Sequence, residues 1–130
     1  MVFIVDDEES VRKGFCLLLR SAGLPHRAFS SAKQFLAEVD PQEEGCVLLD
    51  ITMPKVTGLE LQKELIKRKS RLRVIAISAR DDADIGILAR QLGAQFFLRK
   101  PVDDQALIDA IHWVMGSDCP KPSSAPLSSP

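Results

Sequence analysis

Short, unbroken runs of apolar residues alternate along the chain with longer stretches in which apolar residues recur every three or four positions. The short runs are typical of strands covered on both faces, and the longer stretches of helices with one buried face. The runs that predict strands span residues 2–5, 26–29, 46–50, 73–77 and 95–98. A helical stretch follows each run, the third at about residues 59–69 and the last from residue 103 or 104 to about 115. The pattern therefore predicts five strands that alternate with five helices.

Alternation at this spacing favours right-handed βαβ units, which form a parallel sheet with helices on both faces. We expect an α/β fold with a doubly wound, five-stranded parallel sheet in the flavodoxin-like order 2-1-3-4-5. The clearest strand end follows the run Cys46–Asp50. Pro54 cannot continue a central strand, so this strand should stop near Asp50, at the edge where open α/β sheets bind ligands.

Composition indicates one globular domain followed by a tail. The chain has 130 residues, of which 45% are hydrophobic, as expected for one globular domain. Its net charge of −1 argues against a generally basic nucleic-acid binder. No apolar run approaches the roughly 20 residues of a membrane span, and the first residues lack the pattern of a secretory signal. Residues 117–130 are rich in Pro and Ser. We therefore expect a domain over residues 1–116 and a flexible tail or linker over residues 117–130.

Two further features of the sequence have ordinary explanations. Cys16, Cys46 and Cys119 are widely spaced, which indicates reduced thiols in a cytoplasmic protein rather than a zinc site or disulfides. Lys and Arg residues gather between positions 63 and 73. We interpret them as the solvated end of a helix, because no aromatic or recognition-helix pattern accompanies them.

Polar residues whose side chains could take part in a reaction stand at the ends of four predicted strands. They are Asp6 and Asp7, Asp50, Ser78, and Lys100. The carboxyl ends of parallel strands share one edge, and in the order 2-1-3-4-5 the first and third strands are neighbours. Asp6, Asp7 and Asp50 should therefore converge, with Ser78 and Lys100 closing the other side. Each residue alone is more often a helix cap or a loop residue, and only the combination points to a site.

The negative charges of three converging carboxylates must be balanced by nearby positive charge. Two of them about 5 Å apart repel by roughly 3 kcal/mol at an effective dielectric constant of about 20. Lys100 offsets part of this repulsion, and a divalent cation that prefers oxygen ligands, Mg²⁺ or Mn²⁺, would offset the rest. Asp50 is then the expected nucleophile for a phosphoryl group, with Lys100 and the Ser78 hydroxyl as donors to the developing charge.

The chain resembles the receiver domains of bacterial response regulators, which have a CheY-like fold. The resemblance covers about residues 1–116 and is closest to receivers of the FixJ type. It is carried by Val2–Glu8, Leu48–Pro54 with Gly58, Ile77–Ala79 and Phe97–Pro101.

This resemblance implies that a sensor histidine kinase donates a phosphoryl group to Asp50. It implies that Mg²⁺ is held by Asp7, Asp50 and the backbone carbonyl of Thr52, with Asp6 acting largely through water. Lys100 would pair with the phosphoryl group, and its bond to Pro101 would be cis. Ser78 would move toward the phosphoryl group, so that the aromatic residue at position 97 could turn inward. That residue is Phe97, and the chain has no Tyr.

The resemblance also implies a signalling switch rather than a conventional enzyme. The output surface would comprise the fourth helix, fifth strand and fifth helix, which could contact an output domain or form a phosphorylation-dependent homodimer. Transcription would be controlled through a separate DNA-binding domain, with no direct contact of residues 1–130 with nucleic acid or membrane. A stand-alone phosphorelay receiver is the main alternative. A phosphatase of the haloacid dehalogenase class is disfavoured, because Thr52 stands where that class has a second Asp.

Overall fold

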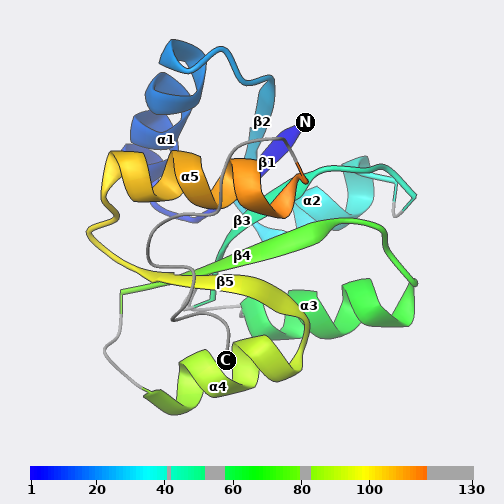
Figure 1. Ribbon diagram of the computed structural model, residues 1–130. Helices are drawn as coiled ribbons and strands as arrows, with labels where there is room; N and C mark the ends of the chain where they lie inside the picture. Colours follow the sequence, from blue (N-terminus) through cyan, green and yellow to red (C-terminus); the bar gives the residue numbers. More distant parts are fainter. Residues whose placement is uncertain (41, 52–57, 80–82, 117–130) are drawn as a thin grey trace.

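The computed structural model describes residues 1–40, 42–51, 58–79 and 83–116 (Figure 1). Strands and helices alternate along these residues. The strands are β1 (Val2–Val5), β2 (His26–Phe29), β3 (Cys46–Asp50), β4 (Arg73–Ser78) and β5 (Ala94–Arg99). The helices are α1 (Glu9–Ser21), α2 (Ala32–Glu38), α3 (Gly58–Lys67), α4 (Ala83–Gln91) and α5 (Asp104–Val114). The predicted alternation is confirmed, with β4 and β5 slightly longer than the apolar runs and α3 displaced toward the N-terminus.

The strands form one parallel sheet in the order β2-β1-β3-β4-β5, which confirms the predicted fold. β1 and β3 are neighbours in register from Val2 opposite Cys46 to Val5 opposite Leu49. β3 and β4 then pair as far as Asp50 opposite Ile77. The residues that follow β1, β3 and β4 therefore emerge at the same edge of the sheet.

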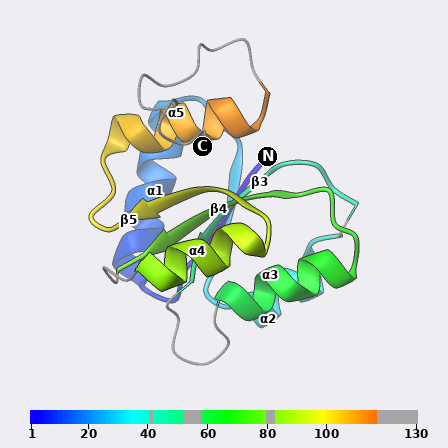
Figure 2. The ribbon, with the colours of Figure 1, turned by 60° about the horizontal axis from the view of Figure 1, so that its bottom comes forward.

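Each face of the sheet carries its own apolar core. α1 and α5 cover one face, while α2, α3 and α4 cover the other (Figure 2). On the second face, the rings of Phe3, Phe29 and Phe35 pack together with centroids 5.4–6.4 Å apart. On the first face, Phe96 and Trp113 form an edge-to-face pair.

Local sequence explains several element ends. The Ser31 hydroxyl accepts a hydrogen bond from the Gln34 amide and caps α2, and the Asp103 carboxylate caps α5 at the Ala106 amide. Lys69 adopts a positive φ of 54°, which is incompatible with a continuing helix, so α3 ends before it.

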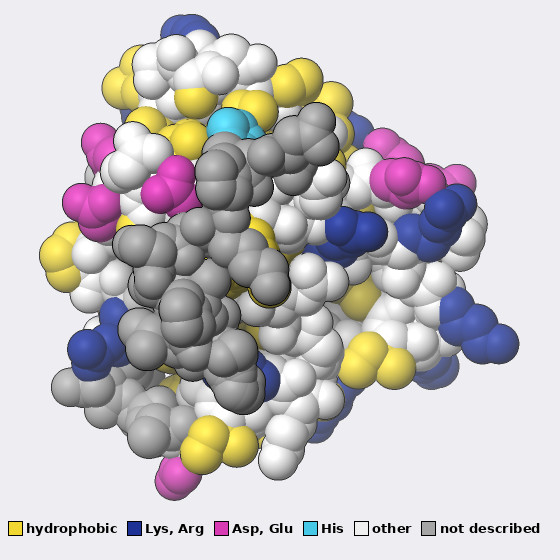
Figure 3. Space-filling view, viewed as in Figure 1, with side chains coloured by type: hydrophobic (Ala, Val, Ile, Leu, Met, Phe, Trp, Pro, Cys, Tyr) yellow, Lys and Arg dark blue, Asp and Glu magenta, His cyan; other side chains and the backbone are white. Residues whose placement is uncertain are grey.

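Two properties of the exterior bear on what the protein could contact. Among the described residues, no helix is both long enough and apolar enough to cross a bilayer. Lys and Arg side chains gather on the side of the molecule where α3 lies (Figure 3). Two basic residues of this region have partners of opposite charge: Arg68 pairs with Glu64 at 2.8 Å, and Arg71 pairs with Glu44 at 2.6 Å. These pairs fit the interpretation of a solvated helix end better than a nucleic-acid surface.

Candidate phosphoacceptor site

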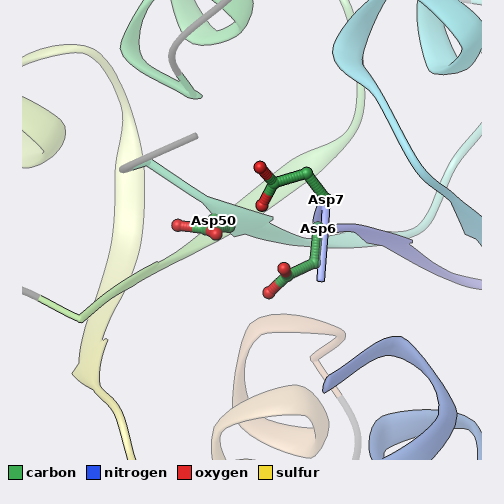
Figure 4. Close-up of side chains that lie close together, drawn as sticks. All are labelled: Asp6, Asp7 and Asp50. Carbon is green, nitrogen blue, oxygen red and sulfur yellow. The ribbon is translucent and has the colours of Figure 1, made fainter. Parts of the chain in front are cut away.

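Three aspartates meet at the carboxyl edge of the sheet. Asp6 and Asp7 directly follow β1, and Asp50 ends the neighbouring strand β3 (Figure 4). One carboxylate oxygen of each residue lies within 4.8 Å of the others. Asp6 and Asp50 are almost fully buried, with 1% and 4% of their surface exposed, whereas Asp7 is exposed. The structure thus brings together the three carboxylates that the strand ends predicted.

Asp6 is fixed by hydrogen bonds on several sides. Its amide continues the sheet by donating to the Phe29 carbonyl at 3.2 Å, and its Oδ1 accepts the Glu8 amide at 2.9 Å. Its Oδ2 is buried without a hydrogen bond, although Lys100 Nζ lies 3.1 Å away. Burial raises the pKa of Asp6 above its ordinary value, against the opposing effects of the Glu8 amide and of Lys100. Ionising Asp6 in the metal-free site is therefore less favourable than ionising an Asp side chain in water.

Lys100 closes the other side of the cluster from the end of β5. Its amide donates to the Ser78 carbonyl at 2.9 Å, which ties the ends of β4 and β5 together. Its Nζ lies 3.1 Å from Asp6 Oδ2, 3.4 Å from Asp50 Oδ2 and 3.4 Å from Glu8 Oε1. Burial lowers the pKa of Lys100, but these carboxylates outweigh burial and raise it above its ordinary value. Lys100 therefore stays positively charged at neutral pH.

The remaining predicted residues have different outcomes. Ser78 ends β4 at the same edge and is fully buried. Phe97 lies farther back on β5, half-buried against the core beneath α4, where a Cβ at Gly86 would come 3.5 Å from its ring. Thr52, whose carbonyl was expected to hold a metal, lies outside the described residues. The Lys100–Pro101 peptide bond is cis, as expected.

Sequence reasoning missed two charged residues beside the cluster. Glu8 reaches Lys100, and Arg12 Nη1 donates to the Asp6 carbonyl at 2.7 Å. A signal for Glu8 was present, because an Asp side chain often accepts a hydrogen bond from the amide two residues on, which fixes the turn at Glu8. The contact of Arg12 depends on the start of α1, which brings position 12 back over the end of β1.

The cluster suits a hard divalent cation. Carboxylate oxygens are the ligands that Mg²⁺ prefers, and Asp6 Oδ2 is a buried oxygen that still lacks a hydrogen bond. Three aspartates with one lysine leave two negative charges in excess, which a divalent cation would balance. The residues present therefore fit such an ion.

Comparison with known proteins gives one consistent result. The profile of the response regulator receiver domain family matches residues 2–112. The chain is 39% identical over 115 residues to the transcriptional regulatory protein FixJ of Azorhizobium caulinodans, covering 88% of this chain and 54% of FixJ. It is 46% identical over 111 residues to the transcriptional regulatory protein TdiR of Thauera aromatica, covering 85% of this chain and 49% of TdiR.

Solved structures agree with the sequence comparisons. The crystal structure of FixJ-N superposes with a TM-score of 0.83 at 34% identity, covering 88% of this chain and 92% of that one. The response regulator StyR gives a TM-score of 0.83 at 41% identity, covering 88% of this chain and 58% of that one. The chain thus spans about half the length of the curated relatives it matches. Family profile, relatives and fold together show that the chain belongs to the response regulator receiver domains, which are phosphorylation-dependent signalling switches.

Proposed function

We propose that Asp50 is the phosphoacceptor of this receiver domain and that a sensor histidine kinase supplies the phosphoryl group. The observation that carries the proposal is the position of Asp50, which is buried at the end of β3 with Lys100 Nζ 3.4 Å from its Oδ2. A carboxylate held beside a fixed cation at a sheet edge suits attack on phosphorus. A phosphatase of the haloacid dehalogenase class is not favoured by the family match.

The transfer exchanges one bond for another. An Asp50 carboxylate oxygen forms a bond to phosphorus, while the bond from phosphorus to the histidine nitrogen of the kinase breaks. The electron pair of the broken bond stays on that nitrogen, and the product is an acyl phosphate on Asp50. Lys100 stabilises the negative charge of the phosphoryl oxygens, and the Ser78 hydroxyl donates to one of them once the switch has occurred.

Mg²⁺ is the cation we assign to this site, with Mn²⁺ as a substitute. Asp6, Asp7 and Asp50 would hold it, and the Thr52 carbonyl completes the proposed set. When bound, the ion neutralises charge on the phosphoryl oxygens. Asp6 and Asp7 would serve to position it, because neither carries the phosphoryl group.

Phosphorylation would change the surface formed by α4, β5 and α5. The phosphoryl oxygens differ in their contacts with Ser78 and Lys100 between two states, which shifts the equilibrium between them. Phe97, packed near Gly86 of α4, would turn inward as part of this change. Ile87 and Leu88 of α4 are 55% and 39% exposed, which suits a surface that contacts an output domain or a second copy.

We infer that residues 1–116 form the switch and that residues 117–130 link it to an output domain that controls transcription. The names of FixJ and TdiR, both transcriptional regulatory proteins, support this output. A stand-alone phosphorelay receiver remains the alternative function.

The test is labelling with acetyl phosphate, a small phosphodonor, followed by intact-protein mass spectrometry. The wild-type protein should gain one phosphoryl group in Mg²⁺ and none in excess EDTA. Asp50→Asn should gain none, because the amide is not a nucleophile. Asp104→Asn, which removes an exposed carboxylate on α5, serves as the matched control and should label like the wild type. Full labelling of the Asp50→Asn protein would refute the assignment.

A further inference from the structure

Lys100 is shared among three carboxylates, and one of them differs from the other two. Asp6 and Asp50 are buried at the floor of the site, whereas the Glu8 side chain is 60% exposed at its mouth. We propose that Glu8 is a positioning residue that holds Lys100 in the unphosphorylated site and competes with the phosphoryl group for it. This inference rests on the proposed function of Asp50 and Lys100.

The backbone around Glu8 explains why its side chain is available to Lys100. Asp6 Oδ1 accepts the Glu8 amide at 2.9 Å, which fixes the turn between β1 and α1. Glu8 occupies the N-cap position of α1 with an extended backbone, but its side chain makes no capping hydrogen bond. Its Oε1 instead lies 3.4 Å from Lys100 Nζ, across 92 residues of sequence.

Competition follows from where Lys100 must go. To contact a phosphoryl oxygen on Asp50, the ammonium group has to weaken at least one of its present contacts. Asp50 itself carries the phosphoryl group, and Asp6 is desolvated, so solvent could not replace the ammonium group if Lys100 left Asp6. The Glu8 carboxylate can be hydrated by solvent when Lys100 leaves it. Glu8 is therefore the contact that Lys100 gives up at the least cost in free energy.

Three variants separate this contact from the general charge of the site. Glu8→Gln removes the charge and the strong acceptor together. Glu8→Asp keeps the charge but shortens the side chain, and Asp at an N-cap position favours bonding to the helix amides over reaching Lys100. Glu9→Gln removes a charge from the next residue, whose partner is Lys13 at 3.3 Å rather than Lys100.

The measurement is the apparent affinity for beryllofluoride, a phosphoryl analogue, with Mg²⁺ in excess. Glu8→Gln and Glu8→Asp should both bind it about 2–5-fold more tightly than the wild type, the range of an exposed ion pair. Glu9→Gln should bind it like the wild type. In the metal-free proteins, the NMR signals of the Lys100 side chain should shift in both Glu8 variants and stay in place in Glu9→Gln.

The outcomes are distinguishable. If Glu8→Asp binds like the wild type while Glu8→Gln and Glu9→Gln both bind more tightly, general charge explains the effect and the inference is overturned. Unchanged affinity in both Glu8 variants overturns it as well, while leaving Asp50 and Lys100 in their proposed roles. Failure of the wild-type protein itself to bind beryllofluoride overturns the proposed function, and this inference with it.

Discussion

Asp6 belongs to the candidate site, but its buried carboxylate lowers the stability of the folded, metal-free protein. It is 1% exposed, and its raised pKa means that the carboxylate is less favourable in the folded, metal-free protein than in the unfolded chain, despite Lys100. Between the ordinary Asp value of 3.8 and the raised value, the folded state holds more protons than the unfolded state. Stability therefore falls as the pH rises through that window, and the loss persists at neutral pH.

Asp6→Asn removes this ionisation and should stabilise the metal-free protein at pH 7 by on the order of 1 kcal/mol. The gain should shrink as the pH is lowered toward 4, because the wild-type carboxyl is then increasingly protonated. Urea denaturation in EDTA at several pH values measures both effects. Adding Mg²⁺ should narrow the difference in unfolding free energy between the variant and the wild type at pH 7, since the cation neutralises the Asp6 carboxylate in the wild type. An Asn variant with the same pH dependence as the wild type would contradict this account.

Residues that directly follow a strand could be placed from sequence, and those that reach the site from elsewhere could not. Asp6, Asp7, Asp50 and Lys100 meet because strand order alone sets their positions. Gln62 shows the same limit of sequence reasoning away from the site. It is 1% exposed on α3, and its Nε2 donates to the carbonyls of Ala89 at 3.0 Å and Leu92 at 3.3 Å, at the end of α4. A polar residue on a helix is expected to be exposed until the packing of two helices is known.

At the scale of elements, the end of β3 is held by the start of α3. Gly58 lies so close to this strand that an added Cβ would come 2.6 Å from the Asp50 carbonyl oxygen and 2.6 Å from Ile51 Cα. Both of these atoms belong to the backbone, so neither can move aside without shifting the strand that carries Asp50. The apolar periodicity predicted α3, but it contains no information about this close approach.

Gly58→Ala should therefore destabilise the protein by about 3 kcal/mol, at the upper end of what overpacking usually costs. It should also slow labelling of Asp50 by acetyl phosphate, because the end of β3 must shift. Gly14→Ala is the matched control. Gly14 lies inside α1 with nothing within 4 Å of an added Cβ, so this change should stabilise the helix by up to about 1 kcal/mol. Urea denaturation of both variants is the measurement, and equal effects would contradict the proposed clash.

At the scale of the whole molecule, the sheet separates two cores, and one of them joins the first and the last helix, α1 and α5. The core beneath α1 and α5 includes Leu107, Ala110, Ile111 and Val114, all with 1% exposure or less. The fold could be predicted because alternating strands and helices leave few ways to cover both faces of a parallel sheet. The boundary at residue 116 rests on composition and on the extent of the resemblance, and truncation of the chain can test it.

A chain ending at Gly116 should unfold with the free energy of the 130-residue chain, within about 0.5 kcal/mol, because the buried apolar residues of the described chain end at Val114. It should also label at Asp50 at the same rate. A chain ending at Val102 lacks α5 and provides the contrast. Burial of a large apolar side chain contributes about 1.5–3 kcal/mol, so losing Leu107, Ile111 and Val114 removes much of the 5–15 kcal/mol typical of a domain. Circular dichroism and urea denaturation would compare the three chains. Clear destabilisation of the chain ending at Gly116 would show that residues 117–130 belong to the folded domain rather than to a linker.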